Sequence, residues 1–89
     1  MIDWKNFKKH KFAVKCSSED AKNKFFTECK KHNIHIFMGD FERQRNIFIC
    51  HYAYVDRFSE GRYELWGIEE YAIKEYGFYQ GIEIVDYKE

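Results

Sequence analysis

The hydrophobic pattern is strongest from Ile47 to Val55, an unbroken run of uncharged, mainly β-branched and aromatic residues without Gly or Pro. This composition predicts a long β-strand. Successive side chains of a strand point to opposite faces of the sheet. One face would carry Ile47, Ile49, His51, Ala53 and Val55, and the other Phe48, Cys50, Tyr52 and Tyr54. Either the fold covers both faces, or the aromatic face is a binding surface.

Helical periodicity is clearest between Ser18 and His32. Ala21, Phe25 and Cys29 recur every fourth residue and form one apolar stripe. Ser18 is a good amino-terminal cap, and Asn33 readily adopts the left-handed conformation that ends a helix. The pattern therefore predicts a helix over Ser18–His32.

The remaining apolar segments complete an α+β order. Alternation predicts further strands at Phe12–Cys16, Ile34–Met38, Arg62–Trp66 and Gly81–Tyr87. Helical spacing predicts a second helix at Ile68–Tyr76 and a short helical turn capped by Asp3. We expect the long strand to form one hairpin with the strand before it and another with the strand after it. Gly67 is expected to end the strand at Arg62–Trp66. The order β-α-β-β-β-α-β predicts one domain over residues 1–89. It would be a two-layer α+β sandwich, in which an antiparallel or mixed sheet of four to five strands carries the long and the short helix on one face.

Charge limits the kinds of partner. The chain has 15 basic and 15 acidic side chains, so its formal net charge is zero. A protein that binds nucleic acid through phosphates usually has a basic excess, and a protein that imitates DNA an acidic one. Basic residues crowd positions 5–31 and acidic residues dominate positions 60–89. This asymmetry favours attraction between the two halves or between two copies, so a homodimer is one candidate assembly.

Cysteine usage indicates the compartment. Cys16, Cys29 and Cys50 are odd in number and widely spaced, which is not typical of a disulfide framework. The start of the chain lacks the apolar core of a secretory signal, and no apolar run is long enough for a membrane helix. We therefore expect a cytoplasmic protein.

Cys16 is a candidate nucleophile, because it precedes a helix amino terminus, which can activate a thiol; however, no histidine lies at a sequence spacing that ties it to Cys16. We expect a buried thiol there and no enzymatic activity.

Metal binding is the next candidate. Cys29, His32 and His35 are spaced three apart, and Cys50 with His51 could approach them in space. Zinc accepts these ligands, but structural zinc sites usually use tighter paired spacings. We expect no metal and no cofactor.

Aromatic recognition is the stronger candidate chemistry. Tyr, Trp and Arg are enriched at the energetic centres of protein interfaces, and aromatic rings on a sheet can also stack nucleotide bases. The rings could equally be core, or cover the outer face of the sheet. The candidate partner-binding residues are Phe48, Tyr52, Tyr54, Trp66, Arg43, Arg45, Arg57 and Arg62.

Two stretches resemble small proteins encoded by phages and mobile elements of low-GC Gram-positive bacteria. They are WKNFKKHKFAVKCSSEDAKNKFFTECKKHNI at the start, with its hydrophobic-Ala-Val-x-Cys strand, and EEYAIKEYGFYQGIEIVDYKE at the end. The central segment 39–66 departs from that pattern, and no functional motif carries over residue by residue. Some small phage proteins of this size block bacterial defence systems, including CRISPR nucleases, by binding to them.

The residues and the resemblance together predict a non-enzymatic inhibitor of phage or mobile-element origin. It would bind a host defence nuclease or effector, as anti-CRISPR proteins do, through the aromatic residues of the long strand. The alternative is a nucleotide- or RNA-binding module, such as a sponge for signalling nucleotides, which would be stabilised by nucleotides without any protein partner.

Overall fold

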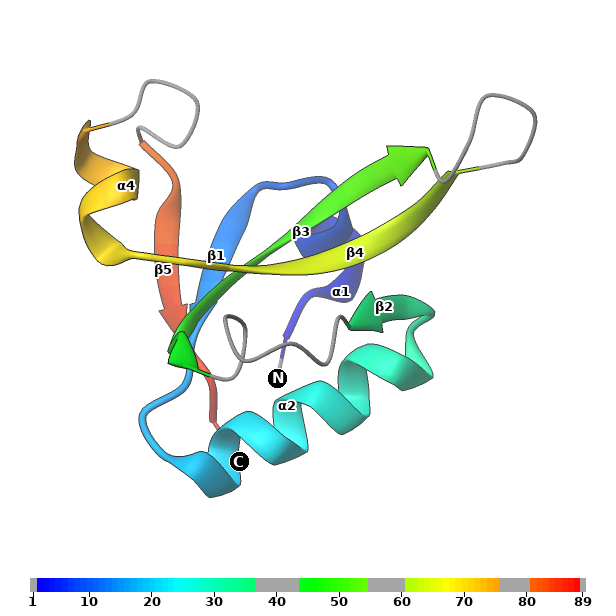
Figure 1. The fold of residues 1–89 in the computed structure, drawn as a ribbon, viewed down its shortest axis with the longest axis horizontal. Helices are drawn as coiled ribbons and strands as arrows, with labels where there is room; N and C mark the ends of the chain where they lie inside the picture. Colours follow the sequence, from blue (N-terminus) through cyan, green and yellow to red (C-terminus); the bar gives the residue numbers. More distant parts are fainter. Residues whose placement is uncertain (1, 37–43, 55–60, 76–80, 89) are drawn as a thin grey trace.

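The chain folds around one mixed sheet. The computed structural model describes residues 2–36, 44–54, 61–75 and 81–88 (Figure 1). The helices are α1 (Trp4–Lys8), α2 (Glu19–Lys31) and α4 (Glu70–Glu75), and the strands are β1 (Phe12–Lys15), β2 (Ile34–Ile36), β3 (Ile47–Tyr54), β4 (Gly61–Ile68) and β5 (Glu83–Asp86). The five strands lie in the order β2-β4-β3-β1-β5. The predicted α+β class and the order of its elements are confirmed.

The β3–β4 hairpin is the centre of the sheet. Its two strands pair antiparallel from Ile47 opposite Ile68 to Tyr54 opposite Gly61. β1 pairs antiparallel with the other edge of β3, whereas β2 is parallel to β4 and β5 is parallel to β1. The predicted hairpin between β2 and β3 is therefore wrong. β4 occupies that edge of β3 along its length, which leaves the short β2 on the far side of β4.

Gly67 does not end β4, contrary to expectation. The strand continues through it to Ile68, and Gly67 pairs with Phe48. A Cβ atom at this position would lie 2.6 Å from Cβ and Cγ of Arg45. The missing side chain therefore lets Arg45 lie close against the strand, and Gly67 serves close packing instead of termination.

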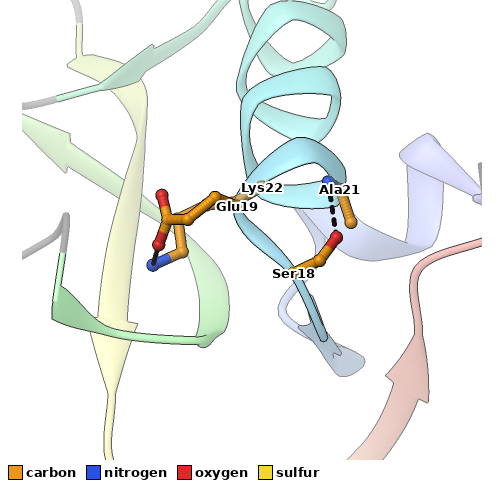
Figure 2. A network of polar contacts seen from close by, with 4 residues as sticks. All are labelled: Ser18, Glu19, Ala21 and Lys22. Atoms are coloured by element: carbon orange, nitrogen blue, oxygen red, sulfur yellow. Dashed lines mark hydrogen bonds and ion pairs between the residues drawn. The ribbon is translucent and has the colours of Figure 1, made fainter.

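Local signals explain α2. The Ser18 hydroxyl accepts a hydrogen bond of 3.1 Å from the backbone N–H of Ala21, and Lys22 forms an ion pair with Glu19 in the same turn (Figure 2). At the other end Asn33 has φ of 61°, the left-handed conformation expected after a helix. The predicted cap, body and stop of this helix are confirmed. Asp3 likewise caps α1, through the N–H of Asn6.

Both faces of the sheet are apolar, and helices lie on both. On one face α1 and α2 cover the larger core, which includes Phe7, Phe25 and Phe48. On the other, Ile73 of α4 packs with the alternate residues of β1 and β3, Ala13, Ile47 and Ile49. The expectation that both predicted helices share one face is corrected here. β1 and β3 carry apolar residues at successive positions, so helices must pack against both faces of the sheet to bury them.

None of the helices in the described ranges has the length and apolar composition needed to cross a bilayer.

Candidate partner-binding surface

The outer end of the β3–β4 hairpin presents the most exposed aromatic ring among the strand side chains that the structure describes. The hairpin extends away from β1 and β5 (Figure 1). Within the described part of the chain, the paired residues of β1 reach only Ile47 and Phe48 of β3. Further along, Tyr52 is 45% exposed, and it pairs across the hairpin with Tyr63. This end of the hairpin therefore offers an aromatic side chain that no other described strand covers.

Three side chains build this surface, which we call the Tyr52 surface: Tyr52, Tyr63 and Lys8. The rings of Tyr52 and Tyr63 meet edge to face, with centroids 5.0 Å apart. The ammonium of Lys8, from α1, lies 5.0 Å from the centre of the Tyr63 ring. Gly61 makes room for this arrangement, because a Cβ atom there would lie 2.6 Å from the Tyr52 ring. In this surface the exposed Tyr52 ring rests on the Tyr63 ring, and the positive charge of Lys8 lies beside them. This combination suits a contact with another protein.

Phe48 belongs to the core, and its assignment as a partner contact is corrected. Its side chain is 0% exposed. The ring packs edge to face against Phe26 at 5.2 Å and lies 5.8 Å from Phe25, between centroids. Phe48 and Tyr52 lie on the same face of β3; Phe48 and the next residue on that face, Cys50, are buried in the core that α2 covers, whereas Tyr52 is exposed. Burial therefore changes along one face, which alternation alone does not predict.

Trp66 lies on the opposite face of the sheet from Tyr52. It pairs with Ile49 and is half-buried beside the smaller core. The His51 ring meets it edge to face, with centroids 4.5 Å apart. The predicted grouping of Trp66 with Tyr52 in one surface is therefore wrong, because the hairpin register sends their side chains to different sides.

The arginines are distributed rather than clustered. Arg45 forms an ion pair with Glu69, just before α4, and Arg62 forms one with Glu64 at 3.0 Å. Arg62 and Glu64 are alternate residues of β4, so both lie on the Trp66 face. Arg43, Arg57 and the side chain of Tyr54 lie outside the residues that the structure describes. Of the five predicted residues whose side chains the structure describes, Tyr52 alone lies in the Tyr52 surface.

The three cysteines are buried in the larger core. Cys16, Cys29 and Cys50 are each at most 1% exposed. Burial raises the pKa of Cys16 to about 11 and that of Cys50 to about 12, and it raises the pKa of Cys29 further. Buried thiols with raised pKa values are poor nucleophiles. No group of three or more potential metal ligands occurs within the described ranges.

Two histidines meet beside the hairpin. Nδ1 of His10 lies 3.0 Å from the carbonyl oxygen of Cys50, and the rings of His10 and His51 have centroids 5.7 Å apart. Burial lowers the pKa of His51, the proximity of His10 lowers it further, and Glu64 acts in the opposite direction. The folded chain therefore favours neutral His51.

This pKa shift predicts a pH dependence of stability. Because the folded pKa of His51 lies below its ordinary value of 6.5, the unfolded chain binds more protons between those two values. We expect the stabilising contribution to be complete above the unfolded pKa and to be lost as the pH falls through 6.5 towards the folded pKa. Thermal unfolding between about pH 7.5 and 5.5 measures this loss. His51→Gln should flatten the profile, whereas Glu64→Gln should steepen it; equal slopes in all three proteins would contradict the assignment.

A cavity that the sequence does not predict lies between the two ends of the chain and α2. Its volume is about 690 Å³, and its lining includes Ile2, Trp4, Glu28, His32, Asp86 and Tyr87. The Trp4 indole stacks on the His32 ring with centroids 4.3 Å apart. The sequence predicts the cap by Asp3 and the helix end at His32, each from its own local signal. No local signal indicates that positions 4, 28 and 86 meet, because only the fold brings them together.

No protein-family model matches the chain, and neither a curated protein nor a solved structure is significantly similar to it.

Proposed function

We propose that this chain is a non-enzymatic binding protein of phage or mobile-element origin that acts in the host cytoplasm. Its target is a host defence nuclease or effector, and it inhibits that target by stoichiometric contact, as an anti-CRISPR protein does. The binding mode is supported by the Tyr52 surface, and the class of target by the resemblance of the two ends of the chain to small phage proteins.

The exposed Tyr52 ring carries the proposal. An aromatic side chain that is 45% exposed and rests on a second ring can bury a large area against a partner with little loss of conformational freedom. Tyrosine is among the residues that most often dominate interface energetics. Lys8 adds one charge beside the rings, which favours an acidic or carbonyl-rich contact.

Recognition of a protein is favoured over nucleotide stacking on the sheet. Stacking of successive bases needs several open rings on one face. On the Tyr52 face, Phe48 is covered by α2, and Trp66 faces the other way. The net charge of zero also supplies no excess of positive charge for a phosphate backbone.

Tyr52→Ala should abolish most of the inhibition while the fold is retained. Loss of a central interface tyrosine typically costs about 2 kcal/mol or more, which is a roughly thirtyfold loss of affinity. The test is co-expression with bacterial defence systems, including CRISPR nucleases, followed by counting plaques of a phage that each system normally restricts. The wild-type chain should restore plaques against at least one system, and Tyr52→Ala should not.

The matched control is Tyr71→Ala. Tyr71 is 53% exposed on α4, on the opposite side of the sheet, so its loss removes a similar exposed ring without touching the Tyr52 surface. We expect this variant to inhibit as well as the wild-type chain. If the wild-type chain restores plaques against no system, the proposed function is overturned. If Tyr52→Ala inhibits as well as the wild-type chain, the Tyr52 surface does not bind the target.

A further inference from the structure

β5 forms one edge of the sheet and directs part of its backbone outwards. Within the described part of the chain, β5 pairs with β1 and with no other strand. The N–H of Tyr87 donates a hydrogen bond of 2.8 Å to the carbonyl oxygen of Lys15, so Tyr87 and every second residue before it face β1. In a parallel pair the residues between them direct both N–H and C=O to the other side. The backbone groups of Ile84 and Asp86 therefore form an open edge.

The cavity between the chain ends and α2 borders this strand on one face. Val85 and Tyr87 line it together with Trp4. Tyr87 packs against the larger core under α2, whereas Ile84 packs into the smaller core on the other face. Strand alternation therefore places Val85 and Tyr87 on the face of the cavity and turns the Asp86 side chain away from it. The cavity volume of about 690 Å³ lies within the range of sites that enclose ligands.

The aromatic walls of the cavity are held in place by ring contacts. The Trp4 ring stacks on His32 at 4.3 Å and lies nearly parallel to Phe25 at 6.0 Å, both between ring centroids. The Tyr87 ring lies 5.5 Å from the Phe25 ring. Both walls thus contact Phe25 of α2, so the cavity does not have to be assembled when a ligand enters.

An open edge beside such a cavity fits an extended peptide. A strand that adds to a sheet lies about 4.8 Å from its neighbour. Its side chain opposite Val85 has a Cβ atom about 5 Å from that of Val85 and points to the face of the cavity. In this mode of recognition the backbone hydrogen bonds provide affinity, and pockets select alternate side chains of the added strand. The edge and the cavity together therefore select an extended segment with an apolar side chain at this position.

Charge separates a partner protein from a second copy of the chain. Glu83 and Asp86 are exposed acidic residues at the two ends of β5. Pairing of β5 with its own copy would bring four carboxylates together on two short strands, with Lys88 beyond each strand to oppose them. Charged residues on an edge strand prevent such self-pairing. Glu83 shares the face of Val85, so a basic residue of a partner segment opposite Glu83 offsets its charge.

We propose that the open edge of β5 binds an extended segment of a partner protein as an additional strand. An apolar side chain of that segment occupies the cavity, and a basic side chain lies opposite Glu83. This site goes beyond the proposed function and does not depend on it, because β5 and the cavity share no residue with the Tyr52 surface.

The direct test is an NMR titration of the isotope-labelled chain with acetyl-Lys-Val-Phe-Val-Lys-amide. The order of its side chains is palindromic, so phenylalanine can lie opposite Val85 in either strand direction. We expect the amide signals of Ile84 and Asp86 to shift, and their N–H groups to exchange with solvent at least about tenfold more slowly. Alanine in place of phenylalanine should weaken binding by about tenfold or more, because the cavity then stays empty.

Methylation of the peptide nitrogens separates strand addition from a general apolar contact. Only alternate N–H groups of a strand face its neighbour. One peptide is methylated at the nitrogens of both valines, and the other at the nitrogen of phenylalanine. One of the two should lose binding and the other should keep it.

Variants of β5 test the same edge from the protein side. Asp86→Pro removes an outward N–H, and Asp86→Ala is the matched control because it removes the same carboxylate and keeps the N–H. Proline is tolerated on an edge strand where its nitrogen faces outwards, so both variants should unfold at similar temperatures. Asp86→Pro should bind the peptide at least about fivefold more weakly than Asp86→Ala. Glu83→Gln should weaken binding about twofold or more, and Glu70→Gln on α4 should leave it unchanged.

Equal effects of the two methylations would overturn the proposal, as would unshifted signals of Ile84 and Asp86 at about 1 mM peptide. A dimeric mass of the free chain in sedimentation, with slow exchange at these two N–H groups, would also overturn it, because a second copy would then occupy the edge. The titration contains no defence system, so its outcome is independent of the plaque assay.

Discussion

Phe48→Ala is expected to lower the free energy of unfolding by about 3–5 kcal/mol, the usual cost of removing a fully buried phenylalanine ring. The ring is 0% exposed and lies among Phe25 and Phe26 of α2, with Gly67 opposite it on β4. Its loss would leave a cavity between the main helix and the centre of the sheet. Since a domain of this size is typically stable by only about 5–15 kcal/mol, most of the stability would be lost. Urea unfolding followed by circular dichroism measures the change.

Tyr52→Ala is the matched control, because Tyr52 lies on the same face of the same strand. Its loss removes one exposed ring and one edge-to-face contact with Tyr63, so we expect a cost of about 1 kcal/mol. Phe48→Leu keeps most of the buried volume and should cost far less than Phe48→Ala, which provides a measurable value if the alanine variant does not fold. A Phe48→Ala variant with unchanged stability would contradict the core assignment.

Local elements could be predicted from the sequence because their causes lie within a few residues. Ser18 reaches the N–H of Ala21 within a single turn, and Asn33 takes the left-handed conformation directly after α2. Likewise, the uncharged run from Ile47 contains within itself the reasons for being a strand. The class of the fold followed from the order of such elements.

Pairing and register could not be predicted, because they depend on contacts between distant segments. The register of the β3–β4 hairpin places Trp66 opposite Ile49, and this alone separates Trp66 from Tyr52. The position of α4 depends on Ala13 and Ile49, which meet only after β1 joins β3. Gly67 resembles a strand breaker unless the approach of Arg45 is known.

The candidate sites show the same division. Tyr52 can be identified from the sequence, because it is an aromatic residue on a strand with alternating faces. The sequence does not separate Phe48 from Tyr52, because only the folded chain shows that α2 covers Phe48. The cavity lined by Trp4, Glu28 and Tyr87 has no signal in the sequence, because these positions come together only in the folded chain.

The second large effect concerns the three thiols, which should react with Ellman's reagent roughly a thousandfold more slowly in the native protein than after unfolding. Cys16, Cys29 and Cys50 are at most 1% exposed, so the reagent reaches them only when the fold opens. Burial also raises the pKa of Cys16 to about 11 and that of Cys50 to about 12, so little thiolate is present near neutral pH. Release of thionitrobenzoate at 412 nm, followed without and with guanidinium chloride, gives the two rates.

Phe48→Ala links the two predictions. If the thiols react only through opening of the core, a loss of about 3 kcal/mol should accelerate their reaction by about a hundredfold, because opening populations follow the free energy of unfolding. Tyr52→Ala, which leaves the core intact, should change these rates by about tenfold at most. Rapid reaction of one thiol in the folded wild-type protein would show that this cysteine is accessible and would exclude it from the core shared by α2 and β3.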